Sequence, residues 1–337
     1  MYQPFYPPYH PPTDEEIRRR QEKQSLRRDA AYIGTLSIAL TLVMQFAFSF
    51  IVLFLVKCGV FSIDDLEKAN LGLSNTAYMF LYMSVYSLSL LIPTLIVSFC
   101  FKKRFSPFTP AKPVPFGAAF LSILAAVGLC MLANVINSYI LYYFKEMGLY
   151  VPDAPQTMVE TPTSLALNLL TMAVLPGLLE EMIYRGYILR TLRAYGDWFA
   201  ILISSLLFSL MHGNLRQIPF AFIVGLVLGL LYVCTNNIWL PIAVHFANNA
   251  ISVMMEYFSF SLPTANQNVF YTLVIYSLIA LGMLCVLAFL IIYLKRLRFS
   301  RNNTTLSFAG RFGVILSSPL FIIAIVLYVL LLFLGAA

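Results

Sequence analysis

The sequence has very little charge. Asp, Glu, Lys and Arg make up 11% of its 337 residues, whereas an average soluble domain has about 25%. Hydrophobic residues make up 60% of the chain. So few charges cannot cover the surface of a water-soluble protein of this length. The composition therefore excludes a soluble enzyme and a disordered chain, and it indicates a polytopic membrane protein.

Cysteine and histidine are also scarce. The five cysteines form no C-x-x-C pair and lie mostly in apolar runs, which excludes a disulfide-stapled domain and favours buried thiols. The three histidines are His10, His212 and His245. His10 lies in a Pro- and aromatic-rich tail, so we expect no catalytic or metal-binding role for it. No apolar h-region precedes Ala30, and we therefore expect no cleavable signal peptide.

The chain is rich in long apolar runs, and a membrane-spanning helix needs about 20 apolar residues. We predict an all-α, polytopic integral membrane bundle of about eight or nine transmembrane helices. The runs cover 32–56, 77–101, 116–143, 164–189, 198–211, 219–234, 240–260, 269–294 and 314–334. The fifth and sixth runs are short, which predicts either helices longer than the runs or a re-entrant pair.

Basic residues lie in short blocks between these runs. A charged helix is predicted over 13–28, with Thr13 and Glu16 as its capping box. If the N-terminus is cytoplasmic, nearly all later basic blocks fall on the same side of the membrane, with Arg216 on the other. This alternation follows the positive-inside rule. We therefore predict a cytoplasmic N-terminus and contact with the lipid bilayer, and the net charge of +7 needs no nucleic acid to explain it.

Ionisable side chains inside spans are costly and usually functional, and here they concentrate in 180–249. In the segment EEMIYR, Glu181 and Arg185 are four residues apart and can pair on one helical face. Glu180 lies about 100° around the helix from Glu181, so it is the freer carboxylate and a candidate general base. Pro176 can kink the helix and open space beside Glu180. A purely structural Glu–Arg network is the alternative.

Two histidine segments follow. His212 closes the segment FSLMH at the end of the fifth run. His245 and Asn249 lie four residues apart in the segment HFANN, so both can donate hydrogen bonds to one small target. Counting about 1.5 Å per residue places His212 nearer the outer side than His245. A shared site therefore requires bends or different helix ends, and polar contacts between helices are the alternative for each histidine.

Taken together, the three patterns resemble a known family. Glu-Glu-x-x-x-Arg, Phe-x-x-x-His and His-x-x-x-Asn on successive spans are similar to the CPBP family of intramembrane proteases. That family includes the type II CAAX prenyl endopeptidases of eukaryotes and bacterial Abi proteins. The resemblance covers about 164–260, and the triplet Tyr-Arg-Gly that ends the first pattern also fits.

The resemblance implies a membrane endopeptidase acting on a membrane-associated protein or peptide. In that family pattern, Glu180 would activate water together with His212. His245 and Asn249 would stabilise the oxyanion of the tetrahedral intermediate. Glu181 and Arg185 are the other two residues of the first motif. They would hold Glu180 and His212 in position.

Whether the site binds a metal ion stays open at this stage. Glu180, His212 and His245 can also supply the His₂Glu ligand set of a catalytic zinc, and the family is catalogued as metalloproteases. The chain has no H-E-x-x-H motif, in which both histidines bind from a single helix. A water activated directly by glutamate and histidine is an equal alternative.

We divide the chain into four parts: 1–30, a Pro/Tyr-rich then charged cytoplasmic segment; 31–160, N-terminal transmembrane helices; 161–262, a CPBP-like catalytic core in the membrane; 263–337, C-terminal transmembrane helices. The resemblance to Abi proteins favours a bacterial cell membrane. Two other classes of protein stay open. The first is a non-catalytic membrane scaffold, or an immunity or regulatory protein. The second is an ion- or proton-coupled transporter. A transporter would need a polar path through the whole membrane, and the other spans offer little of that.

Overall fold

The structure is a computed structural model that describes residues 12–103, 108, 111–149, 151, 159, 161–293 and 304–334. Within these ranges the chain forms helices and turns, with no strand. The predicted all-α class is therefore confirmed. The tail with His10, Arg104 and the basic residues from Lys295 to Arg301 lie outside the described residues.

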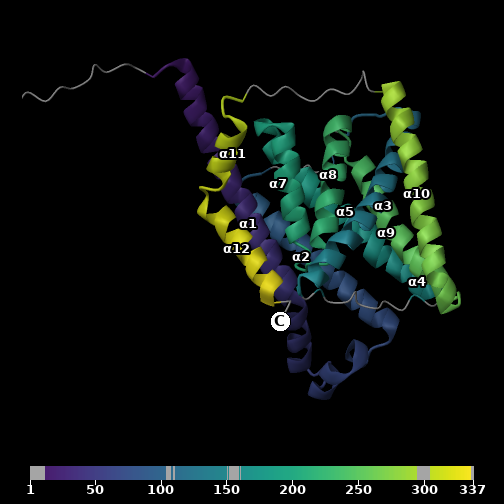
Figure 1. Cartoon of the computed structure of the whole chain (residues 1–337). Helices are drawn as coiled ribbons and strands as arrows, with labels where there is room; N and C mark the ends of the chain where they lie inside the picture. The colour runs from purple at the N-terminus through teal and green to yellow at the C-terminus, as the bar shows by residue number, and fades with distance from the viewer. Residues whose placement is uncertain are drawn as a thin grey trace, which may run out of the picture.

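The helices pack side by side as a bundle (Figure 1). Six helical segments of the described chain are long and apolar enough to cross a membrane, or seven if a bent pair near the C-terminus counts as one. The six segments are α1 (Asp14–Lys57), α2 (Asn75–Cys100), α3 (Phe116–Glu146), Pro162–Tyr195, α8 (Ile218–Thr235) and α10 (Thr264–Tyr293). The predicted polytopic helical bundle is confirmed.

The number of clear spans is lower than the predicted nine because three of the runs form unusual helices. α7 (Asp197–Leu210) has 14 residues, about 21 Å, which is short of a hydrocarbon core of about 30 Å. α9 (Trp239–Phe260) has 22 residues but carries polar side chains, among them His245. α11 (Phe308–Ile315) and α12 (Pro319–Leu334) are the bent pair, with an angle of 79° between them.

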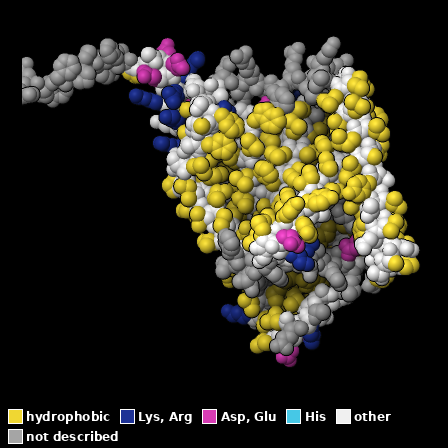
Figure 2. Space-filling model, in the orientation of Figure 1, with side chains coloured by type: hydrophobic (Ala, Val, Ile, Leu, Met, Phe, Trp, Pro, Cys, Tyr) yellow, Lys and Arg dark blue, Asp and Glu magenta, His cyan; other side chains and the backbone are white. Residues whose placement is uncertain are grey.

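The first helix joins the charged segment to the first span without a break. Its predicted capping box is confirmed: the Thr13 N–H donates to Glu16 Oε2 at 2.8 Å, and the Glu16 N–H donates to Thr13 Oγ1 at 3.3 Å. The helix then continues for 44 residues, and Lys and Arg side chains gather at its start (Figure 2). Asp29 accepts hydrogen bonds from Lys103 at 2.6 Å and from the Tyr195 hydroxyl at 2.8 Å, which ties the helix to two later connections.

The outside of the bundle is apolar (Figure 2). Large hydrophobic side chains such as Phe50, Phe54, Phe99 and Ile291 are more than half exposed. Water does not favour such a surface, whereas the hydrocarbon of a bilayer covers it at no cost. The long apolar helices and this surface are those of an integral membrane protein.

Small residues let the helices approach closely. A Cβ atom on Gly128 of α3 would lie 2.5 Å from the Cα of Gly282 on α10, so these two backbones touch. The same holds where α1 meets α12: a Cβ atom on Gly34 would lie 2.5 Å from the backbone carbonyl carbon of Leu320. The packing at these crossings leaves no room for a side chain.

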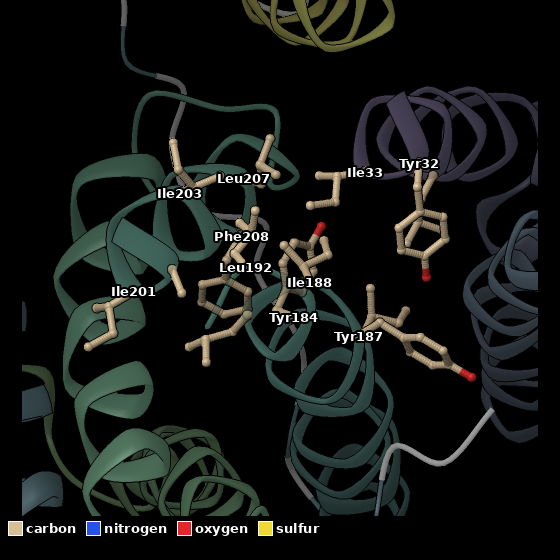
Figure 3. Close-up of a cluster of buried hydrophobic side chains, with 14 of the residues drawn as sticks. Tyr32, Ile33, Tyr184, Tyr187, Ile188, Leu192, Ile201, Ile203, Leu207 and Phe208 are labelled. Atoms are coloured by element: carbon tan, nitrogen blue, oxygen red, sulfur yellow. The ribbon is translucent and has the colours of Figure 1, made fainter. Parts of the chain in front are cut away.

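The fourth spanning segment lies at the centre. It comprises α4 (Pro162–Asn168), η3 (Leu169–Val174), α5 (Leu175–Glu181), η4 (Met182–Leu189), α6 (Arg190–Leu192) and η5 (Arg193–Tyr195). Figure 3 shows side chains of η4, including Tyr184 and Ile188, among buried side chains of α1 and α7. The two short 3₁₀ helices between α1 and α2 are η1 (Ile63–Glu67) and η2 (Ala69–Gly72).

Candidate active site

Two wide turns surround the paired glutamates. The segments η3 and η4, on either side of α5, are π-helical, so the segment stays helical through Pro176. Proline lacks the N–H that a regular helix uses, and the wide turn before it accommodates that loss. Short π-helical stretches inside helices are frequent at functional sites.

A glycine brings the next catalytic helix against α5. A Cβ atom on Gly177 would lie 3.2 Å from the backbone nitrogen of Phe246 and 3.4 Å from its Cα. Because Gly177 has no side chain, α9 can lie directly on α5. This contact places the residue before Phe246, His245, beside the glutamate pair.

Glu181, Arg185 and His245 form a buried chain of polar contacts. The Arg185 Nη1 donates to Glu181 Oε1 at 2.8 Å, and both side chains are fully buried. The Nδ1 of His245 lies 2.8 Å from the same oxygen. Arg185 also donates from Nη2 to the carbonyl oxygen of Gly225, at 3.1 Å. The predicted pairing of Glu181 with Arg185 is confirmed. The pair was expected to hold Glu180 and His212, but the catalytic-motif residue that Glu181 contacts directly is His245.

Glu180 has a separate partner. Its side chain is 6% exposed, and its Oε1 accepts a hydrogen bond of 2.6 Å from the Tyr86 hydroxyl of α2. Its Oε2 has no hydrogen-bond partner among the described residues. Sequence reasoning missed Tyr86, because nothing in its apolar run distinguishes it from other tyrosines. The available signal was general: a buried tyrosine hydroxyl usually finds a partner.

His212 lies just beyond the end of α7. Its Nδ1 donates to the carbonyl oxygen of Phe208 at 2.9 Å, because a carbonyl can only accept. In the neutral ring, Nε2 then keeps its lone pair and can accept a proton. His212 is thus oriented as a base.

The Phe208 ring contacts both histidines. Its ring centroid lies 5.2 Å from that of His212 and 5.9 Å from that of His245, with both imidazoles nearly perpendicular to it. The Arg185 guanidinium lies 4.6 Å from the same ring, a cation–π distance. The two histidines therefore meet at one ring despite their distance in sequence, and Phe208 is their shared contact.

One cavity of about 380 Å³ joins these groups. It is large enough to hold water and a short length of peptide. Its polar lining residues are Tyr82, Tyr86, Thr171, Glu180, His212, Gln217, His245, Asn248 and Asn249. Four of the six predicted site residues therefore line one space, while Glu181 and Arg185 lie behind its wall.

The two asparagines of α9 both reach this cavity. The Asn249 Nδ2 donates to the carbonyl oxygen of Met172 at 2.8 Å, and its Oδ1 accepts from Asn248 at 3.0 Å. A second N–H of Asn249 is left for another acceptor. Asn248, which the motif does not include, is 4% exposed and holds the Asn249 amide in this orientation.

The described residues contain no group of three His, Cys, Asp or Glu side chains that could hold a metal ion. Glu180, His212 and His245 line the same cavity but do not converge closely enough to be such a group. As placed, they do not form the His₂Glu zinc set that the sequence allowed.

Comparison with known proteins points to the same part of the chain. Residues 162–251 match the family described as type II CAAX prenyl endopeptidase Rce1-like. The chain is 27% identical over 141 residues to the "Putative membrane peptidase YdiL" of Bacillus subtilis (strain 168), covering 42% of this chain and 57% of that protein. It is 25% identical over 140 residues to the "Membrane-embedded CAAX protease MroQ" of Staphylococcus aureus (strain USA300), covering 40% and 56%.

The chain thus spans little more than half the length of these two curated relatives. No solved structure matches it significantly. The matched family segment contains all six predicted site residues and both π-helical turns. The resemblance inferred from the three motifs is confirmed: residues 162–251 match the model of the Rce1-like type II CAAX prenyl endopeptidase family.

Proposed function

We propose that this protein is a membrane-embedded endopeptidase that cleaves a peptide bond of a membrane-associated protein or peptide. The observation that carries the proposal is the Glu180 carboxylate. Its side chain is buried and lines a cavity shared with His212; one of its oxygens is held by Tyr86, and the other is buried without a partner among the described residues. The names of both relatives support a peptidase.

The first step is activation of water. A water molecule in the cavity would donate one hydrogen bond to Glu180 Oε2 and the other to Nε2 of His212. As its oxygen bonds to the scissile carbonyl carbon, Glu180 takes one proton. The C–N bond then breaks, and the same proton passes to the leaving amine. No step requires a metal.

The second role is stabilisation of the oxyanion. The Nδ1 of His245 donates to the Glu181 carboxylate, so its Nε2 can donate to the substrate only when the ring carries both protons. With the second N–H of Asn249, His245 then supplies two donors to the developing negative charge.

The experiment compares protein termini in cells that lack the gene, complemented with wild type or with Glu180→Gln at matched membrane levels. Mass spectrometry should find new termini with wild type that disappear with the variant. Identical termini, with the variant still rescuing a phenotype, would contradict the proposal and favour a scaffold. The relatives give no support to the transporter alternative.

The substrate class follows from the membrane location. We propose bacterial peptide precursors as substrates, with a prenylated CAAX-like tail as the alternative that the name of one relative suggests. The sequence of the new termini distinguishes the two, because the second class ends close to a modified C-terminal cysteine.

Metal content tests the metal-free mechanism. We expect the purified protein to retain its activity in the presence of a strong zinc chelator. Zinc bound in a one-to-one ratio, and lost in both Glu180→Ala and His245→Ala, would contradict this expectation.

A further inference from the structure

A second cavity adjoins the proposed active site at His212. It has a volume of about 460 Å³, and it shares Met44, Met211 and His212 with the first cavity. His212, which would orient the attacking water, therefore stands between two spaces. A substrate carbonyl placed against His212 in the first cavity would have part of its chain directed into the second.

The second cavity is built mainly by helices outside the matched family segment. α1 contributes Thr41, Gln45 and Phe46, and α12 contributes Tyr328 and Leu331. These two helices run side by side (Figure 1). The remaining wall is the end of α7. The family segment thus supplies the proposed chemistry, whereas α1 and α12 shape the adjoining space.

Gln45 is the unexplained polar group of this cavity. It lies in the apolar run 32–56, where a polar side chain is costly unless it has a role. Its side chain is exposed and makes no hydrogen bond with any other described residue. Its neighbour Thr41 donates its hydroxyl to the carbonyl oxygen of Ser37 at 2.7 Å. Of these two residues, Gln45 keeps its full hydrogen-bonding capacity.

A peptide that is being cleaved needs such a group. The scissile bond must leave helical structure, so the backbone N–H and C=O groups beside it lose their partners. Inside a membrane these groups require protein partners. A glutamine amide offers one acceptor and two donors on one planar group, which matches an extended backbone. The apolar side chains of Met44, Phe46 and Leu331 suit an apolar substrate side chain.

We propose that the second cavity is a substrate subsite, in which Gln45 pairs with the extended backbone of the substrate on one side of the scissile bond. The subsite rests on the endopeptidase function proposed above. It assigns recognition to α1 and α12, and the substrate class it fits is an unwound peptide segment with an apolar residue next to the cleaved bond.

The test uses the substrate identified from the wild-type termini, made as internally quenched peptides. One peptide has the full length, and two shorter peptides are each truncated on one side of the cleaved bond. The variants are Gln45→Leu, Gln45→Trp and Leu331→Trp in the full-length chain. Leu42→Trp is the matched control, because Leu42 is exposed on the same helix and lines neither cavity.

Gln45→Leu should raise KM for the full-length peptide about fivefold to tenfold, because one or two hydrogen bonds to the substrate are lost. The value of kcat should be nearly unchanged. The tryptophan variants should weaken binding further by filling the space. A peptide truncated on the side that enters the subsite should be cleaved equally by wild type and variants. Leu42→Trp should behave as wild type with every peptide.

Three outcomes would overturn the subsite. Variants that cleave all peptides normally would show that the cavity takes no substrate. Equal losses with full-length and truncated peptides would indicate a structural effect, as would equal losses with Leu42→Trp. If Glu180→Gln produces the same termini as wild type, the endopeptidase proposal fails and the subsite fails with it. A substrate that depends on Glu180 but not on Gln45 overturns the subsite alone.

Discussion

At the scale of single residues, the two adjacent glutamates have opposite surroundings. Glu181 is fully buried and shares one oxygen between Arg185 and His245. Glu180, next to it in the chain, is held by a neutral hydroxyl and opens to a cavity. Both carboxylates keep one oxygen without a partner among the described residues, but Glu181 is bound to a cation behind the cavity wall, whereas Glu180 lines the cavity where a substrate would bind. The two roles thus follow from environment.

Tyr86→Phe should slow cleavage without unfolding the protein. The change removes the hydrogen bond to Glu180 Oε1, and hydrogen bonds to charged groups are worth about 1.5–3 kcal/mol. We expect kcat to fall about tenfold or more. Tyr82→Phe is the control, because Tyr82 stacks on Tyr86 and lines the same cavity. Equal effects of both changes would refute the role of Tyr86.

Glu181→Gln should reduce both stability and activity. It leaves the fully buried Arg185 without its charged partner, which typically costs about 3–5 kcal/mol. The double variant Glu181→Gln with Arg185→Met removes both charges and should recover much of the thermal stability. Its activity should stay low, because His245 loses the carboxylate that holds its ring. A double variant with wild-type activity would contradict the proposed support of His245.

At the scale of helices, the site depends on close contact between α5 and α9. Gly177 permits this contact, and the π-helical turns on both sides of α5 direct Glu180 and Glu181 to different neighbours. A comparable contact joins α7 and α8, where a Cβ atom on Gly225 would lie 2.9 Å from the Cβ of Ser205. The carbonyl oxygen of Gly225 is the one that accepts from Arg185. Glycines therefore set the distances between the catalytic helices.

Gly177→Ala should lower activity more than stability. The added methyl group would lie 3.2 Å from the backbone of Phe246, so α9 must shift by a few tenths of an ångström and move His245. Small displacements of this kind can cost a large part of the rate, and we expect about a tenfold loss of kcat with a small change in Tm. Gly313→Ala is the control, since nothing lies within 4 Å of its added Cβ. The proposal fails if both variants keep wild-type kcat.

At the scale of the whole molecule, charge distinguishes the two ends of the bundle. The charged half of α1 contacts Tyr195, just before α7 begins, and also contacts Lys103, just after α2 ends. His212 follows the opposite end of α7. If the N-terminus is cytoplasmic, as the basic residues predict, the active-site cavity lies toward the outer half of the membrane.

Two native cysteines can test this orientation. Cys58 and Cys100 are exposed, and they follow α1 and end α2, so they lie at opposite ends of the bundle. A membrane-impermeant maleimide should label Cys58 in intact cells and Cys100 only after permeabilisation. Cys58→Ser should abolish labelling of intact cells. Labelling of Cys100 in intact cells would reverse the predicted orientation.

The sequence was sufficient for features that depend on neighbours along one helix. Apolar run length predicted an all-helical membrane bundle, and spacing of four predicted the Glu181–Arg185 pair. The three motifs also named four residues that line one cavity: Glu180, His212, His245 and Asn249. Such predictions succeed because helical periodicity and the cost of burying charge act locally, whatever the rest of the chain does.

Contacts between helices could not be obtained in that way. Tyr86 is 94 residues from Glu180, and His245 is 64 residues from Glu181. The short α7, the bent pair α11 and α12, and the cavity they leave beside His212 likewise depend on packing. Periodicity says which face a residue occupies on its own helix, but the helix that this face meets is decided by close backbone contacts. Only the tertiary structure therefore shows that α1, α2 and α12 contribute to the site.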